Sequence, residues 1–285
     1  MNVILEDENP KNKKLKIFYI AILLICVISI IAALIIQTIN NNNPNSGITS
    51  KLPGLTDNQI SQYKEGFQNI FENKVNYLEN NSYKISKTKE DEEIVYLGYK
   101  NNDTKINDYE LDVNIPYINI KNETIDEFNK QIKDIFESKA KSVLNSQNKN
   151  IIYTVDYSAY VTNNILSVVV RSTLKEGANA QRDIVQTYNY DLTNQKKCTI
   201  DTMLELKGIS KKDASQKIKD EIKIVQSRID ELRNLGYNIY PRDYTSDIYS
   251  INNATEYFIG NDNALYIIYA YGNENHTSEM DIIVM

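Results

Sequence analysis

The sequence predicts an α+β fold in which antiparallel sheets pack against amphipathic helices, preceded by one transmembrane helix. Residues 17–36 form an apolar run without a charge. Residues 151–161 alternate strictly between apolar and other side chains, which is typical of a strand with one buried face. Residues 124–143 and 210–232 repeat apolar side chains at helical spacing. Short strands interrupted by such helices favour an α+β class.

The apolar run is long enough to cross a bilayer, because about 20 helical residues span roughly 30 Å of hydrocarbon. We assign residues 17–39 to a transmembrane helix and residues 1–16 to a cytoplasmic tail. Positive charge lies on the N-terminal flank of the run, which carries Lys11, Lys13, Lys14 and Lys16. On the other flank the first basic residue is Lys51, so the N-terminal flank is expected to face the cytoplasm. A cleaved signal peptide, whose apolar region is about 7–15 residues long, is the less favoured alternative.

Residues 40–55 are predicted to be a flexible linker, because they are polar, contain two Pro and two Gly and show no periodicity. Such a coil reaches on the order of 20 Å. Residues 56–285 are then an extracytoplasmic domain. With Cys26 in the membrane and Cys198 outside it, the two cysteines cannot form an intrachain disulfide, so the domain relies on its core.

The first half of the domain is expected to contain a juxtamembrane helix, two strands and a second helix, at residues 56–80, 93–99, 109–116 and 124–143. Thr56 and Gln59 form a capping-box pair at the start of the first helix. Thr124 and Glu127 form the same pattern at the start of the second. Both helices place apolar residues on one side, so each is predicted to cover a sheet.

The second half is expected to contain one long helix and six strands, at residues 210–235 and at 151–161, 165–170, 184–192, 257–259, 264–271 and 281–284. Asn163 and Asn164 predict a hairpin turn, because Asn tolerates positive φ. Residues 165–170 are apolar on both faces, which predicts a central strand. Ser210 is the expected N-cap of the helix, and Gly236 stands where a C′ residue ends it.

Three stretches of the domain resemble a known family. They read LDVNIPYINIKNETIDEFNKQIKDIF from Leu111, NNILSVVVRSTLKEGANAQRDIVQTYNYDL from Asn163 and YFIGNDNALYIIYAYG from Tyr257. In this order they resemble the extracytoplasmic domain shared by RsiV-type anti-sigma factors and PdaC-type peptidoglycan deacetylases. The resemblance covers roughly residues 110–285, and we assign residues 90–285 to a region of this type. The resemblance implies a membrane-anchored envelope module of a Gram-positive bacterium.

Departures from the family limit what the resemblance implies about activity. The family loop Gly-Gly-Ala-His is replaced here by Glu176-Gly177-Ala178-Asn179, so its histidine is missing. A cytoplasmic tail at residues 1–16 is too short to fold into a segment that binds a sigma factor. We also expect no second domain with the metal ligands of a deacetylase. Neither sigma-factor binding nor deacetylation is therefore expected.

Composition and motifs argue against several functional classes. The formal net charge of -6 disfavours a nucleic-acid partner, which requires a basic face. The single histidine, His276, excludes a histidine-clustered metal site and is expected in an exposed loop. The chain has no G-x-S-x-G, H-E-x-x-H, P-loop or G-x-G-x-x-G motif. Residues 261–263, Asn-Asp-Asn, lack the EF-hand frame and are interpreted as a hairpin turn. We expect no catalytic residue, metal or cofactor.

The candidate ligand-binding residues lie around the loop that follows the predicted central strand. They are Glu176, Gly177, Asn179, Arg182, Asn189 and Asp191. Gly177 can take positive φ and allows close approach of another backbone. Glu176, Asn179 and Arg182 offer an acceptor, an amide and a cation. Asn189 and Asp191 lie on the next strand. An ordinary solvated connection is the alternative, and the strand from Tyr153 to Tyr157 is the second candidate.

We expect a membrane-anchored extracytoplasmic binding or sensing module of the bacterial cell envelope that is not an enzyme. A cell-wall glycan or an extracellular protein is the expected ligand. An envelope enzyme that acts on peptidoglycan through paired carboxylates remains the alternative, and a structural envelope protein is a third. The acidic run Asp91-Glu92-Glu93 is interpreted as a solvated strand entrance.

The predicted topology is testable by protease shaving. We expect protease added to intact cells to degrade the domain, because lysines on one flank of the span orient it outward. A cytoplasmic protein that stays intact in the same sample is the control. Protection in intact cells, with cleavage only after lysis, would contradict this topology.

Overall fold

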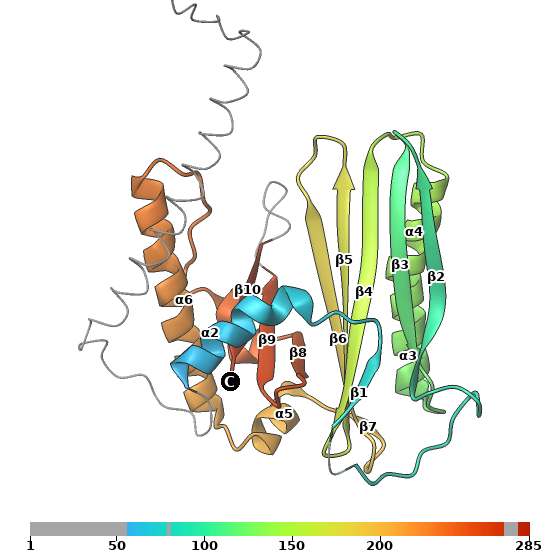
Figure 1. The fold of residues 1–285 in the computed structure, drawn as a ribbon. Helices are drawn as coiled ribbons and strands as arrows, with labels where there is room; N and C mark the ends of the chain where they lie inside the picture. Colours follow the sequence, from blue (N-terminus) through green and yellow to red (C-terminus); the bar gives the residue numbers. More distant parts are fainter. Residues whose placement is uncertain (1–55, 79–80, 271–278) are drawn as a thin grey trace, which may run out of the picture. The chain divides into compact units, whose positions relative to one another are not determined.

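The computed structural model describes residues 56–78, 81–270 and 279–285, which belong to one compact unit, Ser50–Met285 (Figure 1). The predicted tail, transmembrane helix and linker lie outside these residues, as does His276. Within the described ranges, no helix is long and apolar enough to cross a membrane. The unit is a mixed α+β fold with two sheets, as the sequence predicts.

The larger sheet has seven strands, six of them in the order β2-β3-β4-β5-β6-β7, with β1 paired to β4 beside this path. The strands are β1 (Val75–Tyr77), β2 (Val95–Lys105), β3 (Tyr109–Ile118), β4 (Ile151–Thr162), β5 (Ile165–Glu176), β6 (Arg182–Asp191) and β7 (Lys196–Lys197). Most pairs are antiparallel, as predicted, but β3 and β1 both run parallel to β4. The helical connection from β3 to β4 makes that parallel pairing feasible.

The hairpin of β4 and β5 forms the centre of this sheet. Asn163 and Asn164 adopt φ of 49° and 61°, so two consecutive residues with positive φ make the predicted tight turn. The first half of β5, from Ile165 to Val170, is buried on both faces between β4 and β6. The prediction of a central strand is therefore confirmed.

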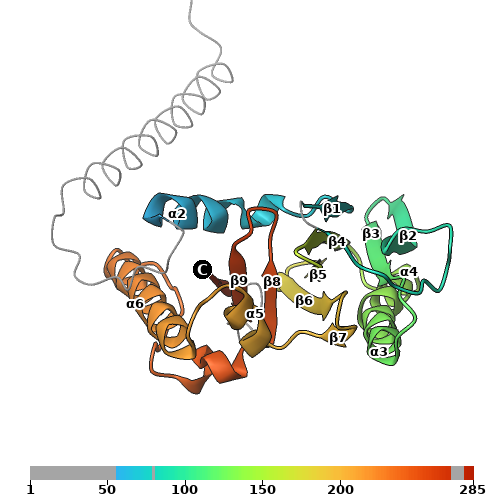
Figure 2. The ribbon, with the colours of Figure 1, turned by 90° about the horizontal axis from the view of Figure 1, so that it is seen from below.

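Two helical segments cover one face of the larger sheet (Figure 2). They are α3 (Glu123–Ile132) and α4 (Ser138–Leu144), joined by a π-helical turn, η2 (Lys133–Glu137). Phe128 of α3 stacks on Tyr188 of β6 with ring centroids 4.5 Å apart. The predicted capping box at Thr124 is wrong. The N-cap is Asn122, whose side chain accepts from the Thr124 N–H, because the helix begins two residues earlier than a cap at Thr124 requires.

The smaller sheet has the strand order β10-β9-β8 and packs against two further helices. Its strands are β8 (Glu256–Ile259), β9 (Leu265–Ala270) and β10 (Met280–Val284). The helical elements of this half of the chain are α5 (Ile200–Leu206), α6 (Lys211–Asn234), η3 (Asp247–Tyr249) and η4 (Ile251–Asn253). Ser210 caps α6 as predicted. Residues 261–263 form the turn between β8 and β9, with Asn263 at φ 60°, in agreement with the hairpin interpretation.

Side chains of the larger sheet hydrogen-bond to the free edge of β8 and join the two sheets. Asn189 of β6 donates to the Tyr257 carbonyl at 2.6 Å and accepts from the Ser167 hydroxyl at 2.7 Å. Ser167 in turn accepts from the Ile259 N–H at 3.2 Å, and Thr187 accepts from the Tyr257 N–H at 3.0 Å. These five residues are the junction. They take the place of a further strand, so the buried edge of β8 is not left without partners.

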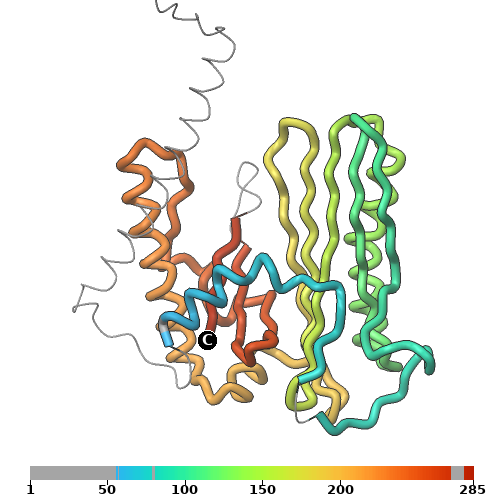
Figure 3. The backbone as a smooth tube through the Cα atoms, in the orientation of Figure 1, coloured from blue at the N-terminus to red at the C-terminus, as the bar shows by residue number. Residues whose placement is uncertain are grey.

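The first described segment crosses both sheets, and residues 56–78 are called the strap (Figure 3). It comprises α2 (Asp57–Gly66), η1 (Phe67–Asn69) and β1. Thr56 and Gln59 form the predicted capping box of α2. Phe67 is fully buried in a cluster to which both sheets contribute. Lys64 pairs with Glu221 of α6, and Glu221 also pairs with Lys217 at 2.7 Å.

The prediction of one helix over residues 56–80 is wrong for residues 70–78, and residues 79–80 lie outside the described ranges. Asn73 adopts φ 53°, donates its N–H to the Tyr157 carbonyl at 2.8 Å and accepts from the Tyr157 N–H at 3.0 Å. The chain then continues as β1 along β4. The apolar spacing is compatible with a helix, but the unpaired edge of β4 offers backbone partners that only the tertiary structure supplies.

The junction gives a stability prediction. Asn189→Ala removes the amide that satisfies Tyr257 and Ser167, and we expect it to lower the free energy of unfolding by about 1–3 kcal/mol. Urea unfolding of the two chains measures this difference. Gln186→Ala on the other face of β6 is the control and should stay within about 0.5 kcal/mol. Equal effects of the two substitutions would contradict the role of Asn189.

Candidate functional site

A groove opens where the larger sheet forks. β3 pairs with β4 only as far as Val113 and Val155, and β1 occupies the rest of that β4 edge. Between β1 and the start of β2 lies a hollow of about 310 Å³. The groove is lined by Asn73, Lys74, Val75, Glu92, Glu93, Val95, Tyr96, Leu97 and Tyr157. Residues 73–75 and 92–97 thus form its two walls, and Tyr157 of β4 contributes from a distant part of the sequence.

A proline explains why the sheet forks at this point. The Ile118 N–H donates to the Asn129 side chain at 2.8 Å and the Ile118 carbonyl accepts from it at 2.9 Å, so the backbone of Ile118 faces away from β2. Pro116 lies two residues earlier and faces the same way, because the strand repeats every two residues. Proline has no N–H to donate, so the pairing of β3 with β4 ends before it.

A single buried amide holds the acidic wall of the groove in place. Asn119 accepts from the N–H groups of Thr88 and Lys89 at 3.1 and 2.8 Å. Its side chain also donates to the carbonyls of Glu92 and Glu93 at 3.3 and 3.1 Å. Asn119 is fully buried, so its hydrogen-bonding groups are all used to fix the loop before β2. The Glu92 and Glu93 backbones are therefore held rigidly beside the groove.

Tyrosines and carboxylates meet at the groove. Burial, and after it the nearby Glu93 carboxylate, raises the pKa of Tyr157, and the same two causes raise the pKa of Tyr77 to about 12. Both phenols therefore remain neutral donors at physiological pH. The ring of Tyr96 contacts Tyr117 edge-on, with centroids 6.1 Å apart, and Lys89 lies 4.1 Å from the Tyr96 centroid.

This arrangement is suited to binding a polar ligand. Carboxylate oxygens accept hydrogen bonds, and the ammonium of a lysine such as Lys74 donates them. An aromatic face stacks on the apolar side of a ligand ring or chain. Among the residues that the structure describes, no three His, Cys, Asp or Glu side chains lie close enough to hold a metal ion. The acidic run interpreted as a solvated strand entrance thus contributes two of its members, Glu92 and Glu93, to the groove.

Four of the predicted site residues gather at the turn between β5 and β6. Gly177 has φ 55°, the positive value that the prediction requires. Arg182 pairs with Glu176, whose carboxylate is also 3.4 Å from the Lys139 ammonium. The carbonyl of Asn179 accepts a hydrogen bond from Lys175. The charges of this turn therefore neutralise one another within the protein.

The other two predicted residues lie elsewhere and have structural contacts. Asn189 is buried in the junction. Asp191 lies at the far end of β6 from Arg182, roughly 30 Å away at about 3.3 Å per strand residue. Burial alone would raise the pKa of Asp191, but hydrogen bonds from Asn194 and Thr193 lower it, and the carboxylate caps the following turn. The six predicted residues do not form one site.

The second candidate, the strand from Tyr153 to Tyr157, meets the groove at one end only. Tyr157 lines it, whereas Tyr153 is buried and its hydroxyl donates to the Phe136 carbonyl at 3.3 Å. Sequence reasoning missed the groove, because its walls come from different parts of the chain. The available signal was the Ile115-Pro116 pair, which marks the end of strand pairing.

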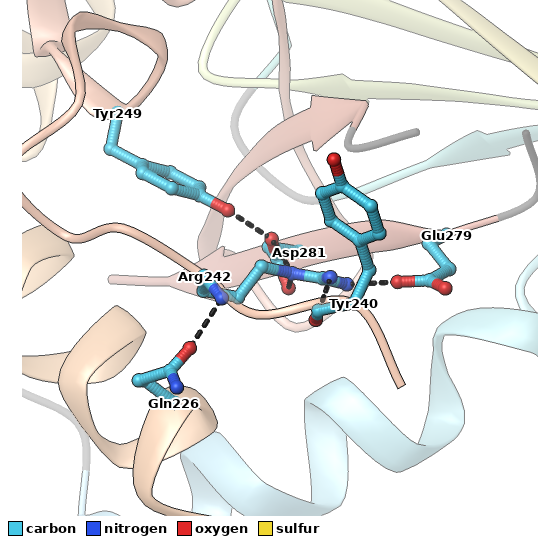
Figure 4. Close-up of polar contacts among 6 residues, drawn as sticks. All are labelled: Gln226, Tyr240, Arg242, Tyr249, Glu279 and Asp281. Atoms are coloured by element: carbon cyan, nitrogen blue, oxygen red, sulfur yellow. Dashed lines mark hydrogen bonds and ion pairs between the residues drawn. The ribbon is translucent and has the colours of Figure 1, made fainter. Parts of the chain in front are cut away.

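A second polar cluster surrounds Arg242 in the irregular segment after α6 (Figure 4). Its guanidinium lies 2.9 Å from Asp281 and 2.6 Å from Glu279, and it donates to the Tyr240 carbonyl at 3.0 Å. The Tyr249 hydroxyl donates to Asp281 at 2.6 Å. This buried network ties the segment to β10, and loss of one charge would leave its partner buried and uncompensated.

The thiol of Cys198 is free and buried, while Cys26 lies outside the described residues. Burial, and after it the charge of Asp191, raises the pKa of this thiol to about 12. The thiolate is the nucleophilic form of cysteine. Cys198 is therefore a core residue and has none of the features of an activated nucleophile.

Comparison with known proteins gives distant fold matches. No family model and no curated protein matches the sequence. A crystal structure of a DUF3298 family protein from Pseudomonas aeruginosa PAO1 is 9% identical and has a TM-score of 0.38, covering 71% of this chain and 90% of that one. A DUF3298 family member from Bacteroides fragilis NCTC 9343 is 10% identical with a TM-score of 0.35, covering 62% and 81%. Neither description names RsiV or PdaC.

The groove gives a prediction about Gly98, beside which Tyr117 packs. A Cβ at Gly98 would lie 2.6 Å from the Tyr117 Cδ2 atom, so Gly98→Ala must displace the ring that contacts Tyr96. We expect a loss of about 1–3 kcal/mol in the free energy of unfolding, measured in urea. Gly66→Ala is the matched control, because nothing lies within 4 Å of its added Cβ. A loss at Gly66 as large as that at Gly98 would contradict the packing argument.

Proposed function

We propose that this chain is a membrane-anchored extracytoplasmic binding module of the bacterial cell envelope, without catalytic activity of its own. The apolar residues 17–39 and the lysines before them support the anchor and its orientation. The order of sequence motifs after Leu111 supports an extracytoplasmic domain of the RsiV and PdaC type in a Gram-positive bacterium. In this proposal the linker at residues 40–55 holds the domain close to the membrane.

The observation that carries the binding role is the groove at the fork of the larger sheet. Its lining includes Tyr96, Glu92, Glu93 and Lys74, and the Lys74 ammonium also lies 3.1 Å from the Glu72 carboxylate. Sugar hydroxyls and amides pair with such acceptors and donors, and the apolar face of a sugar ring stacks on tyrosine. A cell-wall glycan is therefore the ligand class that the groove fits best, and an extracellular protein segment is the second.

A catalytic role through paired carboxylates has less support. Glycosidases place their two carboxyl groups on opposite sides of the scissile bond, about 5–10 Å apart. The two carboxylates of the groove come from adjacent residues on one wall, Glu92 and Glu93, while the other wall offers Asn73 and Lys74. The arrangement therefore favours recognition over hydrolysis.

The proposal is tested with a tryptophan reporter, since the chain contains no Trp. Tyr96→Trp places one in the groove, and soluble fragments of muramidase-digested peptidoglycan are the probe. We expect saturable quenching, and Glu93→Gln or Lys74→Ala in the same chain should weaken binding at least about tenfold, or about 1.4 kcal/mol. These substitutions remove an acceptor charge or a donor from the groove.

Arg182→Ala at the turn between β5 and β6 is the control and should leave the affinity unchanged. An effect at Arg182 without one at Glu93 would return the site to the residues that the sequence predicts. Absence of any saturable signal would contradict glycan binding. Release of new reducing ends from the fragments, lost in Glu93→Gln, would instead support the enzyme alternative.

A further inference from the structure

The last turn of α6 and the residues after it form an apolar projection. It consists of Leu232, Leu235 and Tyr237, which are 38%, 75% and 61% exposed. The end of α6, which carries the projection, lies at the top of the view in Figure 1, whereas β1 and the start of β2, which line the groove, lie at the bottom. The projection and the groove therefore lie at opposite ends of the domain.

The backbone of the projection is fixed by a helix-terminating motif. The Tyr237 N–H donates to the Leu232 carbonyl at 3.1 Å, and the Gly236 N–H donates to the Arg233 carbonyl at 2.9 Å. Gly236 adopts φ 92°, which other residues rarely take. These bonds satisfy the last carbonyls of the helix and hold Leu235 and Tyr237 outward. Their exposure is thus a property of an ordered turn.

The composition of the projection matches the membrane–water interface. Tyrosine is enriched where one end of a side chain is apolar and the other wet, and leucine adds apolar surface that lipid can cover. Arg233 lies in the same turn, and arginine side chains can cover apolar surface with their stem while the charge stays in water. Clustered exposed apolar side chains of this kind mark contact sites more often than isolated ones do.

The proposed anchor keeps a bilayer within reach. The linker at residues 40–55 extends at most to roughly 3.3–3.6 Å per residue, or about 50 Å. Helix α6 has 24 residues, about 36 Å at 1.5 Å per residue, and its Glu221 pairs with Lys64 of the strap, so its far end lies within that reach of the start of the strap. Because the tether converts docking into an intramolecular event, a weak contact suffices to populate it.

We propose that Leu232, Leu235 and Tyr237 contact the surface of the bilayer in which the chain is anchored. This inference rests on the membrane anchor of the proposed function and is independent of the ligand of the groove. Contact at this end of α6 orients the groove away from the lipid, toward the surrounding envelope. The domain is then attached to the membrane through the linker and contacts its surface through the projection.

The test places a single tryptophan in the full chain, reconstituted into phosphatidylcholine vesicles with or without brominated acyl chains. Tyr237→Trp should be quenched about twofold by brominated lipid and shifted to the blue, as expected for a residue at the interface. Leu206→Trp is the matched control. Leu206 is 49% exposed at the end of α5, at the bottom of Figure 1, and should show neither effect.

A second pair of variants tests whether the quenching at position 237 depends on the other apolar residues of the projection. Adding Leu235→Asp to Tyr237→Trp should abolish the quenching, while Leu206→Asp in the same background should leave it. Retention of the chain on vesicles after carbonate washing tests the anchor separately. A retained chain with unquenched Tyr237→Trp overturns the inference alone, as does a concentration-dependent blue shift without bromine quenching, which indicates self-association. A chain that is not retained overturns the anchor and this contact together.

Discussion

The hydrogen bonds that Asn189, Ser167 and Thr187 make to the backbone of β8 are the interaction on which the rest of the domain depends. A strand edge buried against another sheet must find partners for its N–H and C=O groups, and unpaired groups cost more than the bonds gain. Here side chains provide those partners with fixed geometry. The smaller sheet is therefore held at one position against the larger one, and α2 can pack where both sheets contribute apolar residues.

A second constraint concerns the edge of β4, which two strands share. β3 uses its first part, and Pro116 with Asn129 ends that pairing. β1 uses the remainder, and Asn73 bridges the change with its own amide. The groove is the space that this division leaves between β1 and β2. Its existence follows from unsatisfied backbone groups at a fork, and its chemistry follows from the residues that happen to line the two walls.

The strap links these two constraints, because one continuous segment contacts α6, both sheets and the groove. Lys64 binds Glu221 at one end, and Lys74 and Val75 line the groove at the other. Residues 56–78 also follow directly on the predicted linker. Any displacement that reaches Thr56 thus acts on elements that are packed together, which would give the proposed anchor a physical route to the groove.

The sequence by itself determined the elements whose signals are local. Strict alternation predicted β4, paired asparagines predicted its turn, Ser210 and Gly236 bounded α6, and Gly177 took the positive φ expected of it. Tertiary structure alone decided which of these elements share an edge. Residues 70–78 became a strand because β4 lacked a partner, and Asn189 became part of the junction because β8 approached it. For the same reason the groove was not predictable, since no local pattern records that Lys74, Tyr96 and Tyr157 line one hollow. Local sequence encodes periodicity, caps and turns, whereas the pairing of distant backbone groups is settled only when the chain is compact and each buried polar group must find a partner.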